Sequence, residues 1–282
     1  MSNLVWLASY PKSGNTWLRA FIVNLITRPT SPATLDQITA FFESEANPKF
    51  YQRFLTKPVS DASFEELIAL RPKVQQDIMS SQAHGSVMLK THNQLTVFDG
   101  TPLHNLEATA AAIYVLRNPL DVVLSVADHF NLSIDHAIDF VSDPNTGTAT
   151  DEQGVAGFLG SWSQHVQSWT RADSSQFLTL RYEDMLDKPL QTFTKVAKLF
   201  GFAATRQEVQ QAIEFASFKR LRESENATGF TEKPSHTKRF FREGRKNQWI
   251  EKLTEEQILR VVNAHREQMA KHNYLPPKYR KK

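Results

Sequence analysis

The 282-residue chain contains no cysteine. This absence excludes disulfide bonds, thiolate catalysis and zinc sites built on cysteine, and it suits a reducing compartment. The chain also has no apolar run near the roughly 18 residues needed to cross a bilayer. Its N-terminal apolar run is only five residues long and follows no basic segment, so we expect no secretory signal and no membrane span. We therefore expect a cytoplasmic protein.

A strong excess of one charge is missing as well. Lysine and arginine number 33 against 30 aspartates and glutamates, a net charge of +3. The cations form no basic stripe with interleaved aromatic residues, so nucleic acid is not an expected partner. Four of the last five residues are cationic, which predicts a solvated basic tail over residues 276–282. No linker rich in proline, glycine or serine divides the chain, so we expect one domain over residues 1–282.

Four short apolar segments have the length and composition of buried strands: residues 4–9, 86–90, 111–116 and 176–180. Segments with helical character alternate with them: residues 16–27, 63–70, 119–130, 157–170, 190–200 and 254–270. Thr254 and Gln257 have the spacing of a capping box at the start of the last helix. This alternation predicts an α/β fold with a mostly parallel central sheet flanked by helices. Residues 41–57 and 142–154 carry prolines or glycines and are expected to be loops.

Polar side chains follow each predicted strand in turn: Lys12, His92, Arg117 and Tyr182. Ligands of parallel sheets bind at the carboxyl ends of the strands. We therefore expect these four side chains at one edge of one sheet.

The segment YPKSGNTW, residues 10–17, lies between the first predicted strand and the first predicted helix. A loop that leads into a helix N-terminus presents unpaired backbone N–H groups, and Gly14 lets the backbone approach an anion closely. Lys12 adds a positive charge, and Ser13 and Thr16 add hydroxyl donors. The segment predicts a phosphate site.

This loop lacks the order GK[ST] that binds a nucleotide together with Mg²⁺, because Gly14 follows the lysine instead of preceding it. Nothing in the loop therefore calls for a metal. The alternative is a plain turn between strand and helix, capped by Ser13 or Asn15.

Arg117 ends the third predicted strand, and Ser125 lies two turns into the helix that follows. A guanidinium fork and a hydroxyl can bind one phosphate from two sides. An ion pair between Arg117 and Asp121 at the helix start is the alternative.

Lys90 and His92 end the second predicted strand. A histidine next to a lysine suits a general base beside a cation that stabilises negative charge. A hydrogen-bonded or surface histidine without a catalytic role is the alternative.

Five cations crowd the segment before Trp249: Lys238, Arg239, Arg242, Arg245 and Lys246. With Gly244 among them, they suit a loop that closes over an anionic ligand. A solvated charged face is the alternative.

Together these motifs resemble those of the cytosolic sulfotransferase family, and the resemblance runs through most of the chain. YPKSGNTW is similar to the family's 5′-phosphosulfate loop, and RNPLDVVLS, residues 117–125, to its 3′-phosphate motif. KTH, residues 90–92, aligns with the segment that holds the family's catalytic lysine and histidine. Later signatures are matched by GSWSQHVQSW at residues 160–169, LRYEDM at 180–185 and FFREG at 240–244. Within the first of these, we expect Trp162, His165 and Trp169 to be core residues, because they share one helix face.

The chain departs from the family pattern in places. Asn15 replaces a threonine of the phosphate loop, and Glu243 replaces a lysine of the C-terminal loop. Asn247 and Gln248 stand where the family has glycine and aspartate, and Ala216 replaces a threonine that contacts adenine.

The resemblance implies a P-loop-like sulfotransferase fold and transfer of a sulfuryl group from 3′-phosphoadenosine 5′-phosphosulfate to a hydroxyl or amine of a small-molecule acceptor. His92 would act as the general base, Lys12 would neutralise the leaving 5′-phosphate, and Lys90 would assist at the sulfuryl oxygens. No metal is implied. The residues implied in donor binding are Lys12, Ser13, Gly14, Asn15, Thr16, Trp17, Arg117, Ser125, Tyr182, Ser217, Phe218, Arg242 and Gly244.

Two other functions stay open: a metal-dependent kinase of related fold, and a nucleotide-binding relative without activity. The acceptor site is expected to be shaped by residues 41–54, His129, Phe130 and residues 226–236, whose aromatic side chains suit a flat or apolar partner. The identity of the acceptor and the oligomeric state are left open.

Overall fold

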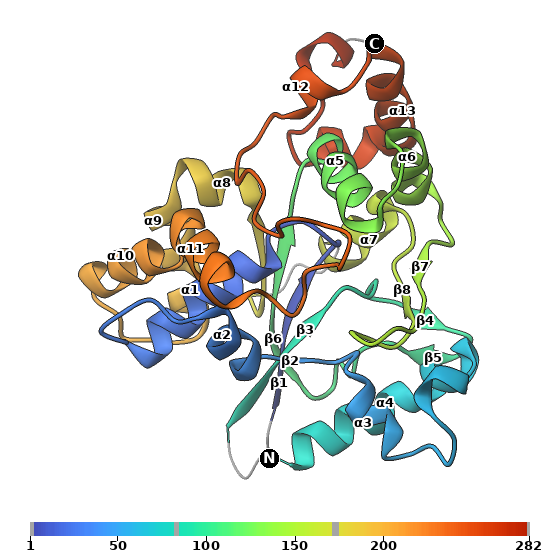
Figure 1. The fold of residues 1–282 in the computed structure, drawn as a ribbon, viewed down its shortest axis with the longest axis vertical. Coiled ribbons are helices and arrows are strands. Elements are labelled where there is room, and N and C mark those ends of the chain that lie inside the picture. Colours follow the sequence, from blue (N-terminus) through green and yellow to red (C-terminus); the bar gives the residue numbers. More distant parts are fainter. Residues whose placement is uncertain (1–2, 82–84, 171–174, 281–282) are drawn as a thin grey trace.

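A five-stranded sheet forms the centre of the computed structural model, which describes residues 3–81, 85–170 and 175–280. Its strands, in order across the sheet, are β2 (Glu43–Ser44), β3 (Ser86–Thr91), β1 (Asn3–Ser9), β6 (Thr109–Leu116) and β9 (Phe177–Arg181) (Figure 1). All neighbouring pairs run parallel, which confirms the predicted α/β fold. Strand β2 escapes prediction, because two residues carry no hydrophobic periodicity.

Helices cover both faces of this sheet (Figure 1). Those whose apolar side chains pack on one face are α1 (Asn15–Thr27), α2 (Leu35–Phe41), α8 (Tyr182–Asp187), α9 (Pro189–Leu199), α10 (Arg206–Phe215) and α11 (Phe218–Thr228). Those on the other face are α3 (Pro48–Gln52), α4 (Phe64–Ser80), α5 (Pro119–Phe130), α6 (Ile134–Ser142), α7 (Trp162–Thr170), α12 (Trp249–Lys252) and α13 (Glu255–Lys271). Side chains of a strand alternate between faces, so Trp6 packs in one core and the adjacent Leu7 in the other.

Short elements fill the connections. Two hairpins pair β4 (Val97–Phe98) with β5 (Thr101–Pro102) and β7 (Gly147–Thr148) with β8 (Gly157–Phe158), and two 3₁₀ turns are η1 (Val59–Asp61) and η2 (Pro277–Tyr279). The predicted loops over residues 41–57 and 142–154 are therefore only partly irregular, since they contain β2, α3 and β7. Of the predicted basic tail, residues 281–282 lie outside the described residues.

Two predicted helices differ from the observed ones. The helix predicted over residues 157–170 begins at Trp162, because β8 occupies its first residues and Gly160 has a φ of +63° that ends any helical run. The helix predicted over residues 63–70 continues to Ser80 through Pro72. Its second half packs Val74 into the core, which offsets the hydrogen bond that the proline removes.

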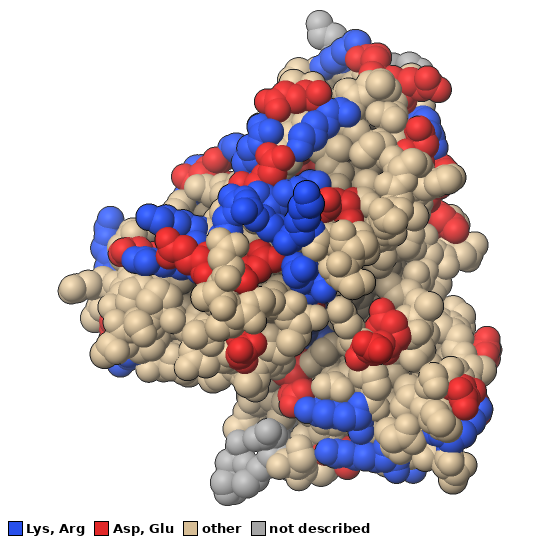
Figure 2. All heavy atoms as spheres, in the orientation of Figure 1, with Lys and Arg blue, Asp and Glu red and all other residues tan. Residues whose placement is uncertain are grey.

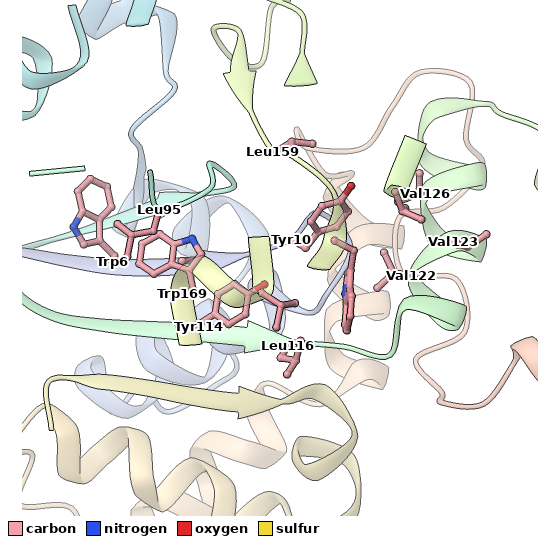
Figure 3. Close-up of a cluster of buried hydrophobic side chains, with 14 of the residues drawn as sticks. Trp6, Tyr10, Leu95, Tyr114, Leu116, Val122, Val123, Val126, Leu159 and Trp169 are labelled. Carbon is pink, nitrogen blue, oxygen red and sulfur yellow. The ribbon is translucent and has the colours of Figure 1, made fainter. Parts of the chain in front are cut away.

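Aromatic side chains dominate the core between β6 and α7. Figure 3 shows Trp6, Trp169 and Tyr114 in this cluster. The rings of Tyr114 and Trp169 stack with centroids 6.1 Å apart. Trp162, His165 and Trp169 are at most 1% exposed, so the prediction of a core role for this helix face is confirmed. Within the described ranges, no helix is both long enough and apolar enough to span a membrane.

Candidate active site

A cavity of about 700 Å³ lies at the carboxyl ends of the central strands. Polar side chains from four strand ends line it: Lys12 after β1, Lys90 and His92 in and after β3, Arg117 after β6, and Tyr182 after β9. Most of the other residues expected to bind the sulfuryl donor also line the cavity: Gly14, Asn15, Thr16, Trp17, Ser125, Ser217, Phe218, Arg242 and Gly244. Ser13 is the exception: it is buried, at 1% exposure, and does not line the cavity.

The loop between β1 and α1 has the backbone of an anion cradle. Lys12 and Gly14 take positive φ values of 66° and 109°, and Gly14 is the N-cap of α1 without any side-chain cap. Capping of the helix by Ser13 or Asn15, as in the alternative of a plain turn, is therefore not observed. A Cβ at Gly14 would lie 2.7 Å from Cδ2 of Tyr182, so the close packing here requires glycine.

Lys12 is a half-buried cation that lies beside two aromatic rings. Its Nζ lies 3.9 Å from the ring centroid of Phe240 and 3.4 Å from Nδ1 of His129. Burial lowers the pKa of Lys12 to about 7, against the opposing effect of Glu232. An anion bound beside the ammonium would raise this pKa again, so the site favours an anionic ligand.

The His92 ring is fixed by strand β1. Its Nδ1 donates to the backbone oxygen of Ser9 at 2.8 Å, because a carbonyl oxygen can only accept. The lone pair of the neutral ring is therefore on Nε2. Burial, with the charge of Lys90 next, lowers the pKa of His92 to about 3, so the imidazole is neutral at pH 7.

His165 supports His92 from within the core. Its Nε2 donates to the backbone oxygen of His92 at 3.0 Å, and its Nδ1 accepts from the hydroxyl of Tyr114 at 2.9 Å. Both ring nitrogens are used by the neutral form of His165. Burial lowers its pKa to about 4, against the opposing effect of the hydrogen bond to His92.

We expect the free energy of unfolding to fall as the pH drops from about 6.5 to about 4, because the unfolded chain protonates His165 over this range while the folded chain does not. The contribution is fully present above pH 6.5 and amounts to a slope of about 1.4 kcal/mol per pH unit. Urea denaturation at a series of pH values measures it. The variant His165→Gln should show a shallower slope, and an unchanged slope would contradict the assignment.

Arg117 and Ser125 are brought together, as their spacing suggests. Nη1 of Arg117 donates to Oγ of Ser125 at 3.2 Å and to the backbone oxygen of Lys12 at 2.9 Å. The alternative, an ion pair with Asp121, is wrong: Asp121 instead accepts from the backbone N–H of Asn247 at 2.7 Å and of Trp249 at 3.2 Å.

A group of aromatic side chains lies beside Arg117. Its guanidinium carbon is 4.4 Å from the ring centroid of Tyr182, and Tyr182 meets Trp17 edge to face at 5.7 Å. Phe218 packs on Gly244, where a Cβ would come within 2.3 Å of the ring. This region offers flat apolar surfaces on which a nucleotide base can stack.

The C-terminal loop, residues 229–248, passes over the cavity. Figure 2 shows lysine and arginine side chains gathered on this side of the molecule. The sequence predicts that five cations between residues 238 and 246, all within the described ranges, close over an anionic ligand. Of these five, Arg242 alone lines the cavity, and it pairs with Asp128 at 3.1 Å. Arg245 pairs with Glu243 and Lys246 with Asp187 on the surface. Lys238 and Arg239 are exposed. Most of these cations therefore belong to a solvated charged face, the alternative given for this segment.

The departure at Glu243 has a structural reason. The carboxylate accepts from Nε of Arg245 at 2.7 Å and from Nζ of Lys252 at 2.8 Å. These hydrogen bonds, that of Lys252 first, lower the pKa of Glu243 to about 2. Glu243 therefore ties the loop to α12.

The part of the cavity wall expected to bind an acceptor differs from its prediction. Of residues 41–54, only Ser44, Glu45 and Ala46 are lining residues. The aromatic side chains of that stretch pack in the two cores, except Phe41, which is exposed. Of residues 226–236, only Glu232 lines the cavity. The predicted His129 and Phe130 do line it, and the apolar surface is completed by side chains that escape prediction: Phe140, Val155, Leu159, Phe240 and Phe241.

The fold and the cavity define an α/β protein of P-loop-like architecture with buried and half-buried cations at the carboxyl edge of its sheet. The family model for the sulfotransferase domain matches residues 2–273. The chain belongs to the sulfotransferase family, as its motifs predict.

The sequence and the fold of the chain are both similar to those of known proteins. The chain is 26% identical over 275 residues to flavonol 3-sulfotransferase of Flaveria bidentis, covering 92% of this chain and 79% of that one. It is 28% identical over 269 residues to cytosolic sulfotransferase 1 of Arabidopsis thaliana, covering 89% and 73%. Its fold is similar to that of retinol dehydratase in complex with androsterone and the inactive cofactor PAP, with a TM-score of 0.66 and 16% identity over 98% of this chain and 83% of that one.

Proposed function

We propose that this chain, acting as one domain, transfers a sulfuryl group from 3′-phosphoadenosine 5′-phosphosulfate to a hydroxyl or amine of a small-molecule acceptor. One observation carries the proposal: His92, Lys12, Lys90 and the pair Arg117 and Ser125 line a single cavity. The retinol dehydratase complex supports the choice of donor, because PAP is what remains of that donor after the sulfuryl group has left. The name of the Arabidopsis relative supports a cytoplasmic location.

The residues present fit such a donor. Two lining residues, Trp17 and Arg117, have a buried donor, Nε1 and Nε respectively, without a hydrogen-bond partner within the described chain. A buried donor without a partner costs free energy, and a bisphosphate can supply the missing acceptors. In the proposal Lys12 and the backbone of residues 13–17 bind the 5′-phosphate.

The rest of the donor would be held further along the cavity. Arg117 and Ser125 would bind the 3′-phosphate together with Arg242 and Gly244 of the C-terminal loop. Trp17 would stack on adenine, and the adenine contacts would be completed by Tyr182, Ser217 and Phe218.

His92 would accept the acceptor's proton on Nε2 while the acceptor oxygen attacks sulfur in line. The bond from sulfur to the 5′-phosphate oxygen breaks, and the protonated Lys12 neutralises the charge that this phosphate keeps. Lys90 stabilises the sulfuryl oxygens during transfer. The His92 ring is neutral at pH 7, the state in which a general base has to begin the reaction.

Mass spectrometry with isotopically labelled donor tests the proposal. We expect the label in a sulfated product from at least one member of a panel of phenols, flavonols, steroid alcohols, sugars and tyrosine peptides. Turnover of ATP that EDTA abolishes would favour the kinase instead. Binding of adenosine 3′,5′-bisphosphate without transfer to any acceptor would favour a relative without activity.

A further inference from the structure

Glu232, on the C-terminal loop, is the counter-charge of a buried cation, Arg19, and a half-buried one, Lys90. Its two oxygens accept from Nη2 of Arg19 at 2.8 and 2.9 Å, and one of them lies 3.0 Å from Nζ of Lys90. The Arg19 side chain is 1% exposed, that of Lys90 16% and that of Glu232 20%. All three are therefore largely removed from water, where charges interact strongly.

This ion triad is anchored in the phosphate loop. Nε of Arg19 donates to Oδ1 of Asn15 at 3.1 Å, and Nδ2 of Asn15 donates to the backbone oxygen of Leu7 at 2.9 Å. Asn15 is the position at which this chain departs from the family's phosphate loop. Its side chain serves Arg19, so a continuous polar path runs from strand β1 through Arg19 and Glu232 to Lys90.

The C-terminal loop has other attachments that do not depend on Glu232. The carboxylate of Glu225 accepts from the backbone N–H groups of Phe240 and Phe241, and Asp121 accepts from that of Asn247. The pairing of Arg242 with Asp128 adds another contact. When the charge of Glu232 is removed, these contacts should therefore keep the C-terminal loop in its position over the cavity.

We propose that Glu232 is a positioning residue: it holds the Lys90 ammonium at the cavity wall and keeps it protonated for the transferred sulfuryl group. This inference rests on the proposed transfer. Lys90 touches the reacting group in that proposal, and Glu232 contacts Lys90 directly, while its charge also raises the pKa of Lys12 without a contact.

The charges around Lys90 come from several elements. Arg19 on α1, Lys12 on the phosphate loop and the rings of His92 and His129 all interact with Glu232 or Lys90. Burial lowers the pKa of Lys90, Arg19 lowers it further, and Glu232 opposes both. Although burial disfavours the charged carboxylate, Arg19 and Lys90 keep the pKa of Glu232 below its usual range. Without the carboxylate, the ammonium would lose its proton at a lower pH.

The test compares the full-length chain with Glu232→Gln and Glu232→Asp. In Glu232→Gln we expect kcat to fall about tenfold or more and the alkaline limb of its pH profile to move to lower pH by about one unit. The dissociation constant of adenosine 3′,5′-bisphosphate should change by less than about threefold, because this ligand has no sulfuryl group. Glu232→Asp, which keeps the charge, should restore the position of the limb. Glu223→Gln on the exposed face of α11 is the matched control.

Site-resolved labelling of Lys90 separates this inference from the proposed function. A small acylating reagent modifies the unprotonated amine, and peptide mass spectrometry across a pH series gives the labelling midpoint for Lys90 apart from Lys12. We expect the midpoint to move down in Glu232→Gln even where no acceptor is known. An unchanged midpoint and pH profile, or weaker bisphosphate binding with an unchanged kcat, would make Glu232 a structural contact only. Lack of product from the unaltered chain would instead count against sulfuryl transfer.

Discussion

His92→Ala is expected to lower kcat by about 10²- to 10⁴-fold, the range found when a general base is removed. Nδ1 of His92 is fixed by Ser9, which leaves Nε2 to take the acceptor's proton. An alanine provides no substitute, so proton removal would depend on water. Steady-state kinetics at saturating donor and acceptor measures the loss.

The loss should be confined to chemistry. Adenosine 3′,5′-bisphosphate should bind His92→Ala almost as tightly as the unaltered chain, since the proposed phosphate contacts come from other residues. His136→Ala, an exposed histidine on α6, is the matched control and should keep normal rates. A kcat for His92→Ala within about threefold of normal would show that another group is the base.

Arg117→Ala is expected to weaken binding of adenosine 3′,5′-bisphosphate about 10- to 100-fold, because hydrogen bonds to a charged group contribute about 1.5–3 kcal/mol. Adenosine 5′-phosphate lacks the 3′-phosphate and should lose little. Calorimetric titration of both ligands gives the two ratios. We expect the two ligands to respond differently because Arg117 contacts Ser125, and this pair is proposed to bind the 3′-phosphate.

Arg117 also donates to the backbone of Lys12 and so supports the phosphate loop. Comparing the two ligands separates the two roles, because a damaged loop would weaken both equally. Equal losses would therefore assign Arg117 a structural role. Arg53→Ala, which removes an exposed arginine paired with Asp77, should leave both affinities unchanged.

The residues at strand ends could be predicted because parallel strands present their carboxyl ends at one edge. A short apolar strand followed by a polar residue is a local pattern, and this pattern is sufficient to place Lys12, His92 and Arg117 at that edge, where all three line the cavity. The capping box of α13, formed by Thr254 and Gln257, is equally local and is present as predicted.

Contacts between distant segments could not be predicted in this way. Arg19 and Glu232 are 213 positions apart, and neither stands in a pattern that points to the other. For the aromatic side chains of residues 41–54, the sequence instead predicts a binding role that the structure does not show. Composition suggests an acceptor wall, but Phe50 and Tyr51 pack into the core instead, because composition does not say which way a side chain points.

A crystal structure of the chain with adenosine 3′,5′-bisphosphate tests the central claim most directly. The account predicts the 5′-phosphate on the loop of Lys12 and Gly14, the 3′-phosphate within hydrogen-bond distance of Arg117 and Ser125, and His92 facing the 5′-phosphate. A ligand bound elsewhere, or bound with its two phosphates away from Lys12 and Arg117, would contradict it.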